Sequence, residues 1–255
     1  MYKPIQYFKS SSPDSRVKYS EYAPFSCLSE FVVCYWSVTS KGPVANLPHR
    51  ILPDGCIDII FDLENKLSFI SGISKETARL YLNGTISFLG IRFHPGSIVH
   101  LLEDKASVYL NNGFETRYSS VVIRDMADRV LNADSPGEAV QIIDRELIRF
   151  FSSYQKKGQF STLLEHSLFS KGCISVKDLS FYHGLSERHI SRLFNENVGL
   201  STKNFLRIVR FQNALKYLNS GLPTLDISFD LGYFDQSHLL KEMKRYLGEE
   251  LNSRV

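Results

Sequence analysis

Short apolar runs separated by turn residues dominate the chain between Phe31 and Pro95. The runs are rich in β-branched and aromatic residues and occupy positions 31–38, 57–61, 67–70 and 88–93. Turn signals such as Pro53-Asp-Gly55 and Asn83-Gly84 lie between them. Many short strands at close spacing predict a small sandwich or barrel, and we assign residues 20–118 to this β-rich part.

From Ser119 onward the apolar period changes to that of helices. Val122, Met126 and Val130 recur at every fourth position, as on the buried face of a helix. A second helix is predicted after Ser135-Pro136, with an apolar stripe made of Val140, Ile143, Leu147, Phe150, Phe151 and Tyr154. Lys156-Lys-Gly158 is typical of a helix end. A first domain is therefore predicted over 1–157, helical over 119–157, with a boundary near Gly158.

The remaining residues contain an internal repeat. Residues 178–184 (DLSFYHG) match 226–232 (DISFDLG) at an offset of 48. After one inserted residue the match continues at an offset of 49, as far as Gly199 and Gly248. Repetition at a fixed period indicates two copies of one supersecondary unit.

Each copy has the features of a helix-turn-helix. A short helix is followed by a turn glycine, Gly184 or Gly232, and a second helix begins at a capping residue, Ser186 or Asp235. We predict helix-turn-helix units over about 176–197 and 224–247, a long linker helix over about 201–219, and a cap at Thr224, all within a second domain over 158–255. The predicted fold class is α+β, with a β-rich N-terminal domain and an all-α C-terminal domain.

The second helix of each copy separates apolar from polar positions. The residues expected to face the core are Ile190, Leu193 and Phe194 in the first copy and Leu239, Leu240 and Met243 in the second. The outer residues are Glu187, Arg188, His189, Ser191, Arg192 and Asn195, and in the second copy Gln236, Ser237, His238, Lys241, Lys244 and Arg245. Cationic and hydrogen-bonding side chains of this kind read base edges and hold phosphates. His189 and His238 occupy the same place in both copies and are expected to pack or to meet a phosphate.

This repeat resembles the DNA-binding domain of AraC/XylS transcription regulators over about 160–248. The resemblance rests on HISRLF at 189–194, GLS at 199–201, GYF at 232–234 and YLG at 246–248. It implies a bacterial transcription regulator, expected to be an activator, whose partners are promoter DNA and RNA polymerase. It also implies that the recognition helices enter successive major-groove segments roughly 34 Å apart. The base-reading positions it assigns are Arg188, Ser191 and Arg192, then Gln236, Ser237 and Lys241, with Arg192 contacting guanine.

The chain departs from the family pattern near its end. A Ser-Pro pair usually follows the last glycine, whereas Glu249 and Glu250 stand here, and Thr202 replaces a usual Pro. Two glutamates would repel phosphate. We therefore expect the second unit to grip DNA less firmly, and base-specific binding to depend mainly on Arg188 and Arg192.

The N-terminal half contains candidate effector-binding residues. The segments 52–60 and 90–96 look like motifs in the regulatory domains of one subset of this family. Asp58, Arg92 and His94 are polar residues on otherwise apolar strands. They form either a structural hydrogen-bonded network or, with Trp36 and Tyr81 as walls, a pocket for a small effector.

Composition narrows the alternatives. The net charge is +3 over 255 residues, and residues 159–255 carry twelve Lys and Arg against ten Asp and Glu, which predicts a moderate salt dependence of DNA binding. No apolar run reaches the roughly 20 residues of a membrane helix. Residues 1–20 are too polar for a signal peptide. A cytoplasmic location without a membrane partner is expected.

Enzymatic activity, metals and cofactors are not expected. His49, His94 and His100 do not form the His-x-His pattern of a cupin-type metal oxygenase. The cysteines are widely spaced and are expected to be reduced, although a sensor built from Cys27, Cys34 and Cys56 is an alternative, as is an enzyme fused to a DNA-binding domain. A constitutive DNA-binding protein without an effector is a third alternative. The apolar stripe either docks on the β-rich part or pairs with helix 136–157 of a second subunit in a homodimer.

Overall fold

Two antiparallel sheets form the N-terminal β-domain, which we define as residues 17–118. The computed structural model describes residues 2–6, 16–152, 154 and 158–248. One sheet has the strand order β1 (Val17–Tyr22), β2 (Val32–Ser40), β7 (Ser87–Phe93), β4 (Asp58–Asp62), β5 (Leu67–Ser71) and β8 (Gly113–Glu115). The other pairs β3 (Val44–Ile51) with β6 (Ala78–Gly84). The short helix α1 (Val99–Leu102) and 3-10 turns at Ser26–Leu28, Ala106–Tyr109 and Thr116–Tyr118 complete this part.

The strands predicted from the sequence are β2, β4, β5 and β7, and they form the centre of the large sheet. Ile59 and Ile91 at this centre are fully buried. Asn83 and Gly84, predicted to form a turn, are instead the last two residues of β6, and the break before β7 falls at residues 85–86. None of the seven residues of β6 is buried: five are exposed and two are half-buried.

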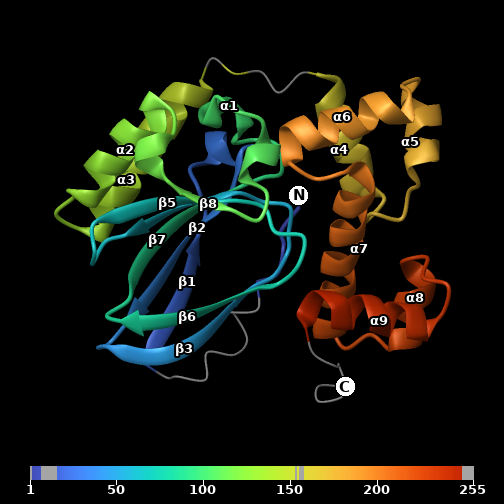
Figure 1. Ribbon diagram of the computed structural model, residues 1–255, viewed down its shortest axis with the longest axis horizontal. Helices are drawn as coiled ribbons and strands as arrows, with labels where there is room; N and C mark the ends of the chain where they lie inside the picture. Colours follow the sequence, from blue (N-terminus) through green and yellow to red (C-terminus); the bar gives the residue numbers. More distant parts are fainter. Residues whose placement is uncertain (1, 7–15, 153, 155–157, 249–255) are drawn as a thin grey trace.

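Helices α2 (Val121–Leu131) and α3 (Pro136–Phe151) pack beside the large sheet (Figure 1). Ile143, Leu147 and Phe151 of the apolar stripe are buried in the chain's own core, and the rings of Phe31 and Phe151 stack with centroids 4.0 Å apart. These residues of the stripe therefore pack within the chain, and the homodimer through helix 136–157 stays a prediction. The helix ends at Phe151, earlier than predicted, and Lys156-Lys157 lie outside the described residues.

The helical region, residues 158–248, consists of α4 (Gln159–Phe169), α5 (Val176–His183), α6 (Glu187–Val198), α7 (Thr202–Asn219), α8 (Thr224–Asp230) and α9 (Gln236–Leu247). The α+β class with a β-rich first part and a helical second part is confirmed. Two predicted caps bond as expected: Ser186 Oγ accepts from the His189 amide at 3.2 Å, and Asp235 Oδ1 accepts from the His238 amide at 2.6 Å.

Two details of the helical region differ from the prediction. Pro223 rather than Thr224 is the N-cap of α8. Leu240 is 38% exposed, because the buried positions Leu239, Met243 and Tyr246 place it on the outer face of α9. Across the described ranges, no helix is long and apolar enough to cross a membrane.

Candidate nucleic-acid interface and ligand cavity

The second helices of the two repeat copies, α6 and α9, are the candidate recognition helices, and they lie at opposite ends of α7 (Figure 1). The 18 residues of α7 span about 27 Å at 1.5 Å per residue. This length is similar to one turn of B-form DNA, roughly 34 Å. The linker helix therefore sets a separation between α6 and α9 that suits neighbouring turns of a duplex.

The outer face of α6 carries the candidate DNA-reading residues on an open surface. Arg188 and Asn195 are exposed, and they border a shallow groove together with Ser191 and Arg192. The Arg192 guanidinium lies 3.5 Å from the Glu196 carboxylate, which also pairs with Lys105 of the β-domain at 3.2 Å. The Arg192 side chain is 58% exposed, so this pair is weak and its exchange for a base contact costs little.

The outer face of α9 is also polar and exposed. It presents Gln236, Ser237, Lys241, Lys244 and Arg245. Arg245 lies 3.7 Å from Glu76 of the β-domain. His238 packs edge-on against Tyr233 and its Nδ1 accepts from the Phe234 amide at 3.4 Å. His238 is thus held by neighbours of its own unit, and its half-buried counterpart in α6 is His189.

A buried glutamate, Glu242, joins the second unit to the linker helix. Its carboxylate accepts from Arg207 Nε at 3.2 Å and from the Tyr233 hydroxyl at 3.1 Å. Arg210 lies 3.4 Å from the same carboxylate and its guanidinium covers the Tyr233 ring at 4.4 Å. Burial and the neighbouring Glu242 charge raise the pKa of Tyr233. The sequence analysis did not predict this network. A sign of it in the sequence is Glu242, a charged residue between the apolar positions 239 and 243.

The β-domain touches the C-terminal ends of both recognition helices at equivalent repeat positions. Gly199, which ends α6, lies so close to the Ala106 carbonyl that an added Cβ would come within 2.7 Å of its oxygen. At the end of α9, Arg79 Nη2 donates to the Gly248 carbonyl at 3.0 Å and the Thr77 hydroxyl donates to the Tyr246 carbonyl. The β-domain therefore contacts the C-terminal end of both α6 and α9.

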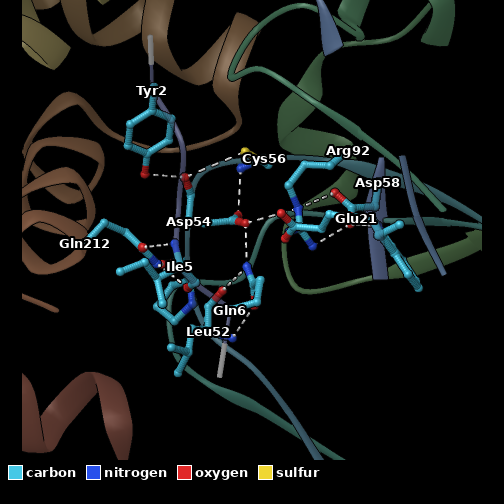
Figure 2. A network of polar contacts seen from close by, with 12 residues as sticks. Tyr2, Ile5, Gln6, Glu21, Leu52, Asp54, Cys56, Asp58, Arg92 and Gln212 are labelled. Carbon is cyan, nitrogen blue, oxygen red and sulfur yellow. Dashed lines mark hydrogen bonds and ion pairs between the residues drawn. The ribbon is translucent and has the colours of Figure 1, made fainter. Parts of the chain in front are cut away.

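The linker helix is held by a third contact. Gln212 of α7 is 3% exposed; its Nε2 donates to the Pro53 carbonyl at 2.9 Å and its Oε1 accepts from the Ile5 amide at 2.7 Å. Figure 2 shows Gln212 next to the N-terminal residues that also reach Asp54. Phe205 packs under Gly55 of the same turn. The turn 53–55 and residues 2–6 thus connect the β-domain to the middle of α7.

A cavity of about 370 Å³ lies inside the β-domain, between the two sheets. Apolar side chains form most of its lining, among them Val38, Ile60, Phe69, Leu80, Leu82 and Phe88. Of the effector-pocket candidates, Trp36, Asp58 and Arg92 line it. Tyr81 does not: it is 61% exposed, because Leu80 and Leu82 take the inward positions of β6 and strand alternation turns Tyr81 outward.

The remaining candidate, His94, is buried just beyond the end of β7, and its amide donates to the Phe31 carbonyl at 2.8 Å. It is not among the residues that line the cavity. Several polar residues of the lining were not predicted from the sequence, among them Gln6 and Asp54. Asp54 was assigned to a turn alone, and residues 2–6 gave no signal.

Polar groups gather at one wall of the cavity. The Arg92 guanidinium forms a two-point contact with Asp58, from Nε at 3.2 Å and from Nη2 at 2.8 Å. Trp36 Nε1 donates to the same carboxylate at 2.9 Å. The indole lies against Gly90 of the neighbouring strand, where any side chain would overlap it. Because Gly90 has no side chain, the indole of Trp36 can pack directly against the backbone of β7.

Asp54 is the second carboxylate beside Arg92. Its Oδ2 lies 3.5 Å from Arg92 Nε and accepts from Gln6 Nε2 at 2.6 Å, and its Oδ1 accepts from the Cys56 amide at 2.8 Å (Figure 2). Burial raises the pKa of Asp54 to about 6, against the opposing effect of Arg92 and with a further rise from Asp58. At pH 7 the Asp54 carboxylate is therefore mostly ionised, although its buried surroundings stabilise the charge poorly.

Neither a metal cluster nor a disulfide is found among the residues with described coordinates. No group of three or more His, Cys, Asp or Glu there could hold a metal ion. Cys34 and Cys56 are buried, Cys27 and Cys173 are exposed, and all are free thiols. Burial raises the pKa of Cys56 far above its usual value, which makes that thiol unreactive.

Comparison with known proteins gives matches to both parts of the chain. Residues 179–252 match a family model described as a helix-turn-helix domain, and residues 20–115 match a domain of unknown function. The Bacillus subtilis (strain 168) protein "Uncharacterized HTH-type transcriptional regulator YbfI" is 33% identical over 66 residues, which are 26% of this chain and 24% of that protein. The chain thus matches about a quarter of the length of this curated relative.

Solved structures of ToxT from Vibrio cholerae are also similar. The P21 crystal form at 1.65 Å is 12% identical with a TM-score of 0.41, covering 94% of this chain and 97% of that one. ToxT from strain O395 is 10% identical with a TM-score of 0.36, covering 94% and 97%. Scores this low indicate only a distant likeness.

Proposed function

We propose that this chain is a DNA-binding transcription regulator of the AraC type, and that it reads two successive major-groove segments with α6 and α9. The match of residues 179–252 to a helix-turn-helix family model and the likeness to a protein described as an HTH-type transcriptional regulator support this proposal. The β-domain controls this binding. Activation, with RNA polymerase as the protein partner, is proposed on the resemblance to AraC/XylS regulators alone. Residues 1–157 are the proposed regulatory domain and 158–255 the proposed DNA-binding domain.

The placement of α6 and α9 at the two ends of one linker helix is the observation that carries this proposal. Both helices begin at a bonded cap and end at a glycine in the left-handed region, with φ of +79° at Gly199 and +71° at Gly248. Their polar outer faces are exposed. Glu242 fixes α9 against α7 through Arg207 and Arg210, which supports a rigid two-helix reader.

Within this reader, α6 makes the main base-specific contacts. Arg188 and Arg192 are exposed cations on the open face of α6. Arginine contacts guanine through two hydrogen bonds, worth about 1–3 kcal/mol of discrimination. On α9, Arg245 lies near Glu76, whose charge offsets part of the attraction to phosphate. The second unit therefore contributes less to affinity.

Control by the β-domain is supported by where it makes contact. It touches the end of α6 at Gly199, the end of α9 at Gly248 and the middle of α7 at Gln212. These are the elements that set the distance and angle between the recognition helices. A change in the β-domain can thus alter how well both helices fit one duplex.

The test is selection of bound sequences from random DNA with the full chain, followed by hydroxyl-radical footprinting. We expect two protected segments about one helical turn apart. Arg192→Ala should lose at least about tenfold in affinity and lose base preference in one segment, whereas Arg124→Ala, an exposed arginine of α2, should bind like the wild type. A single protected segment, or unchanged base preference in Arg192→Ala, refutes the proposal.

A further inference from the structure

The cavity of the β-domain has walls suited to an organic molecule. Besides its aliphatic lining, four aromatic side chains border it, Tyr19, Trp36, Phe69 and Phe88. The rings of Tyr19 and Trp36 stack with centroids 6.5 Å apart. Apolar cavities of roughly 300 Å³ and more with a few polar groups at one side are typical of small-molecule sites. Aromatic faces in addition attract cations.

The part of the polar wall around Arg92 has more carboxylates than guanidinium groups. Around the Arg92 guanidinium lie Asp58 at 2.8 Å and Asp54 at 3.5 Å, and the Glu21 side chain points toward it in Figure 2. Arg50 also lines the cavity, from β3 of the other sheet. His49 beside it is neutral at pH 7, because burial lowers its pKa to about 4.

We propose that this cavity binds a small amphipathic ammonium ion, with the apolar body between Trp36 and Phe88 and the ammonium group at Asp54. A carboxylate ligand would meet the carboxylates of Asp54 and Asp58 and would have to displace them from Arg92. A sugar would leave many hydroxyl groups against apolar walls, where each unpaired group costs free energy. The regulatory meaning of the site rests on the proposed function, whereas its ligand preference does not.

Three segments of the described chain line the cavity and also touch the helical region. Asp54 faces the cavity while the neighbouring Pro53 accepts from Gln212 of α7. Gly72 and Ser74 line the cavity, and Ile73 between them lies against Gly199 at the end of α6.

The third segment is β6. Leu80 lines the cavity, and the preceding Arg79 donates to Gly248 at the end of α9. A ligand that moves any of these walls by a small amount therefore also moves a contact of the linker or of a recognition helix.

The single tryptophan of the chain, Trp36, makes the proposal measurable by intrinsic fluorescence. The full chain without DNA is titrated with 3-phenylpropylamine, 3-phenylpropan-1-ol and 3-phenylpropanoate, which share one apolar body and differ in the head group. We expect saturable changes in Trp36 emission, with the dissociation constant of the amine at least about tenfold below that of the carboxylate. Equal or tighter binding of the carboxylate, or no saturable change with any probe, overturns the proposal.

Two variants locate the head group. Asp54→Asn should remove most of the preference for the amine over the alcohol. The control Asp62→Asn alters another buried carboxylate of the same sheet, one that bonds Asn65 at 2.8 Å and does not line the cavity, and it should keep the preference. Retention of the preference in Asp54→Asn refutes the placement. The wild-type series decides the ligand class even where Asp54→Asn does not fold.

Failure of this inference is distinct from failure of the proposed function. Loss of the two-segment footprint with an intact preference for the amine refutes only the DNA-reading proposal. An intact footprint without binding of the amine refutes only the ligand proposal.

Discussion

The Glu242→Gln substitution tests whether the second helix-turn-helix unit is anchored to the linker by a buried charge. Glu242 is 1% exposed in its side chain, and it faces Arg207 and Arg210 of α7. Glutamine is of the same size and can still accept from Tyr233. Its amide nitrogen, however, would face a guanidinium donor where a carboxylate oxygen now accepts. The substitution thus removes the charge and leaves the packing in place.

The expected loss follows from the exposure of the partners. Removal of one partner from a fully buried pair costs about 3–5 kcal/mol. Arg207 is 32% and Arg210 17% exposed, so water partly resolvates both cations after the substitution. We therefore expect a destabilisation of about 2 kcal/mol, concentrated in α8 and α9 because Glu242 joins these helices to α7.

Hydrogen exchange measured by mass spectrometry resolves this loss by segment. Amides of residues 224–247 should exchange about 30-fold faster in Glu242→Gln, since each 1.4 kcal/mol corresponds to a factor of ten. The matched control is Glu196→Gln, which removes a glutamate that also faces two cations, Lys105 and Arg192, but lies on the surface. That change should alter exchange less than about threefold.

Equal effects of the two substitutions would refute the reasoning, because burial of the carboxylate is what separates them. A loss spread evenly over the helical region would also contradict it. In that case Glu242 would stabilise the region as a whole and would not specifically fix the second unit against α7.

Further predictions concern the β-domain. Gly90→Ala should destabilise the chain by about 1–3 kcal/mol in urea denaturation and shift Trp36 emission, because the added methyl group overlaps the indole; unchanged emission would contradict the packing. Gln212→Ala should cost about 1–3 kcal/mol by leaving the Ile5 amide and the Pro53 carbonyl without their partner, and limited proteolysis should then cut the N-terminal residues sooner. The pKa of Asp54 is raised to about 6 in the fold, so its contribution to the free energy of unfolding is complete below about pH 4 and is lost as the pH rises through 6. The wild type should therefore lose up to about 3 kcal/mol relative to Asp54→Asn between pH 4 and 7, and pH-independent parallel stability curves would argue against a buried, poorly stabilised carboxylate.

The helical region could be predicted from the sequence because its signals are local. The repeat, the caps Ser186 and Asp235 and the linker helix all depend on residues within one or two helical turns of each other. The predicted helix-turn-helix domain is confirmed by the family match over 179–252. Leu240 was misplaced because its apolar side chain suggested the core, whereas helix geometry leaves that position outside.

The β-domain was predictable only at its centre. The central strands are buried on both faces and therefore form continuous apolar runs. Strands β3 and β6 pair across more than twenty residues and contain no long apolar run, so no short window reveals them. The contact of Gln212 with Ile5 joins residues 207 positions apart. Nothing in the sequence near either residue indicates it, and the role of Asp54 at the cavity was missed for the same reason.

The arrangement of contacts limits what control by the β-domain can do. The domain contacts the linker through Gln212 and the ends of α6 and α9 at Gly199 and Gly248, whereas the polar outer faces of these two helices are exposed. A ligand can shift an equilibrium only by its difference in affinity for the two states. Any such shift acts first on the separation and angle of the two helices. The proposed control should therefore leave the bases preferred by each helix the same and alter the spacing between the two bound segments.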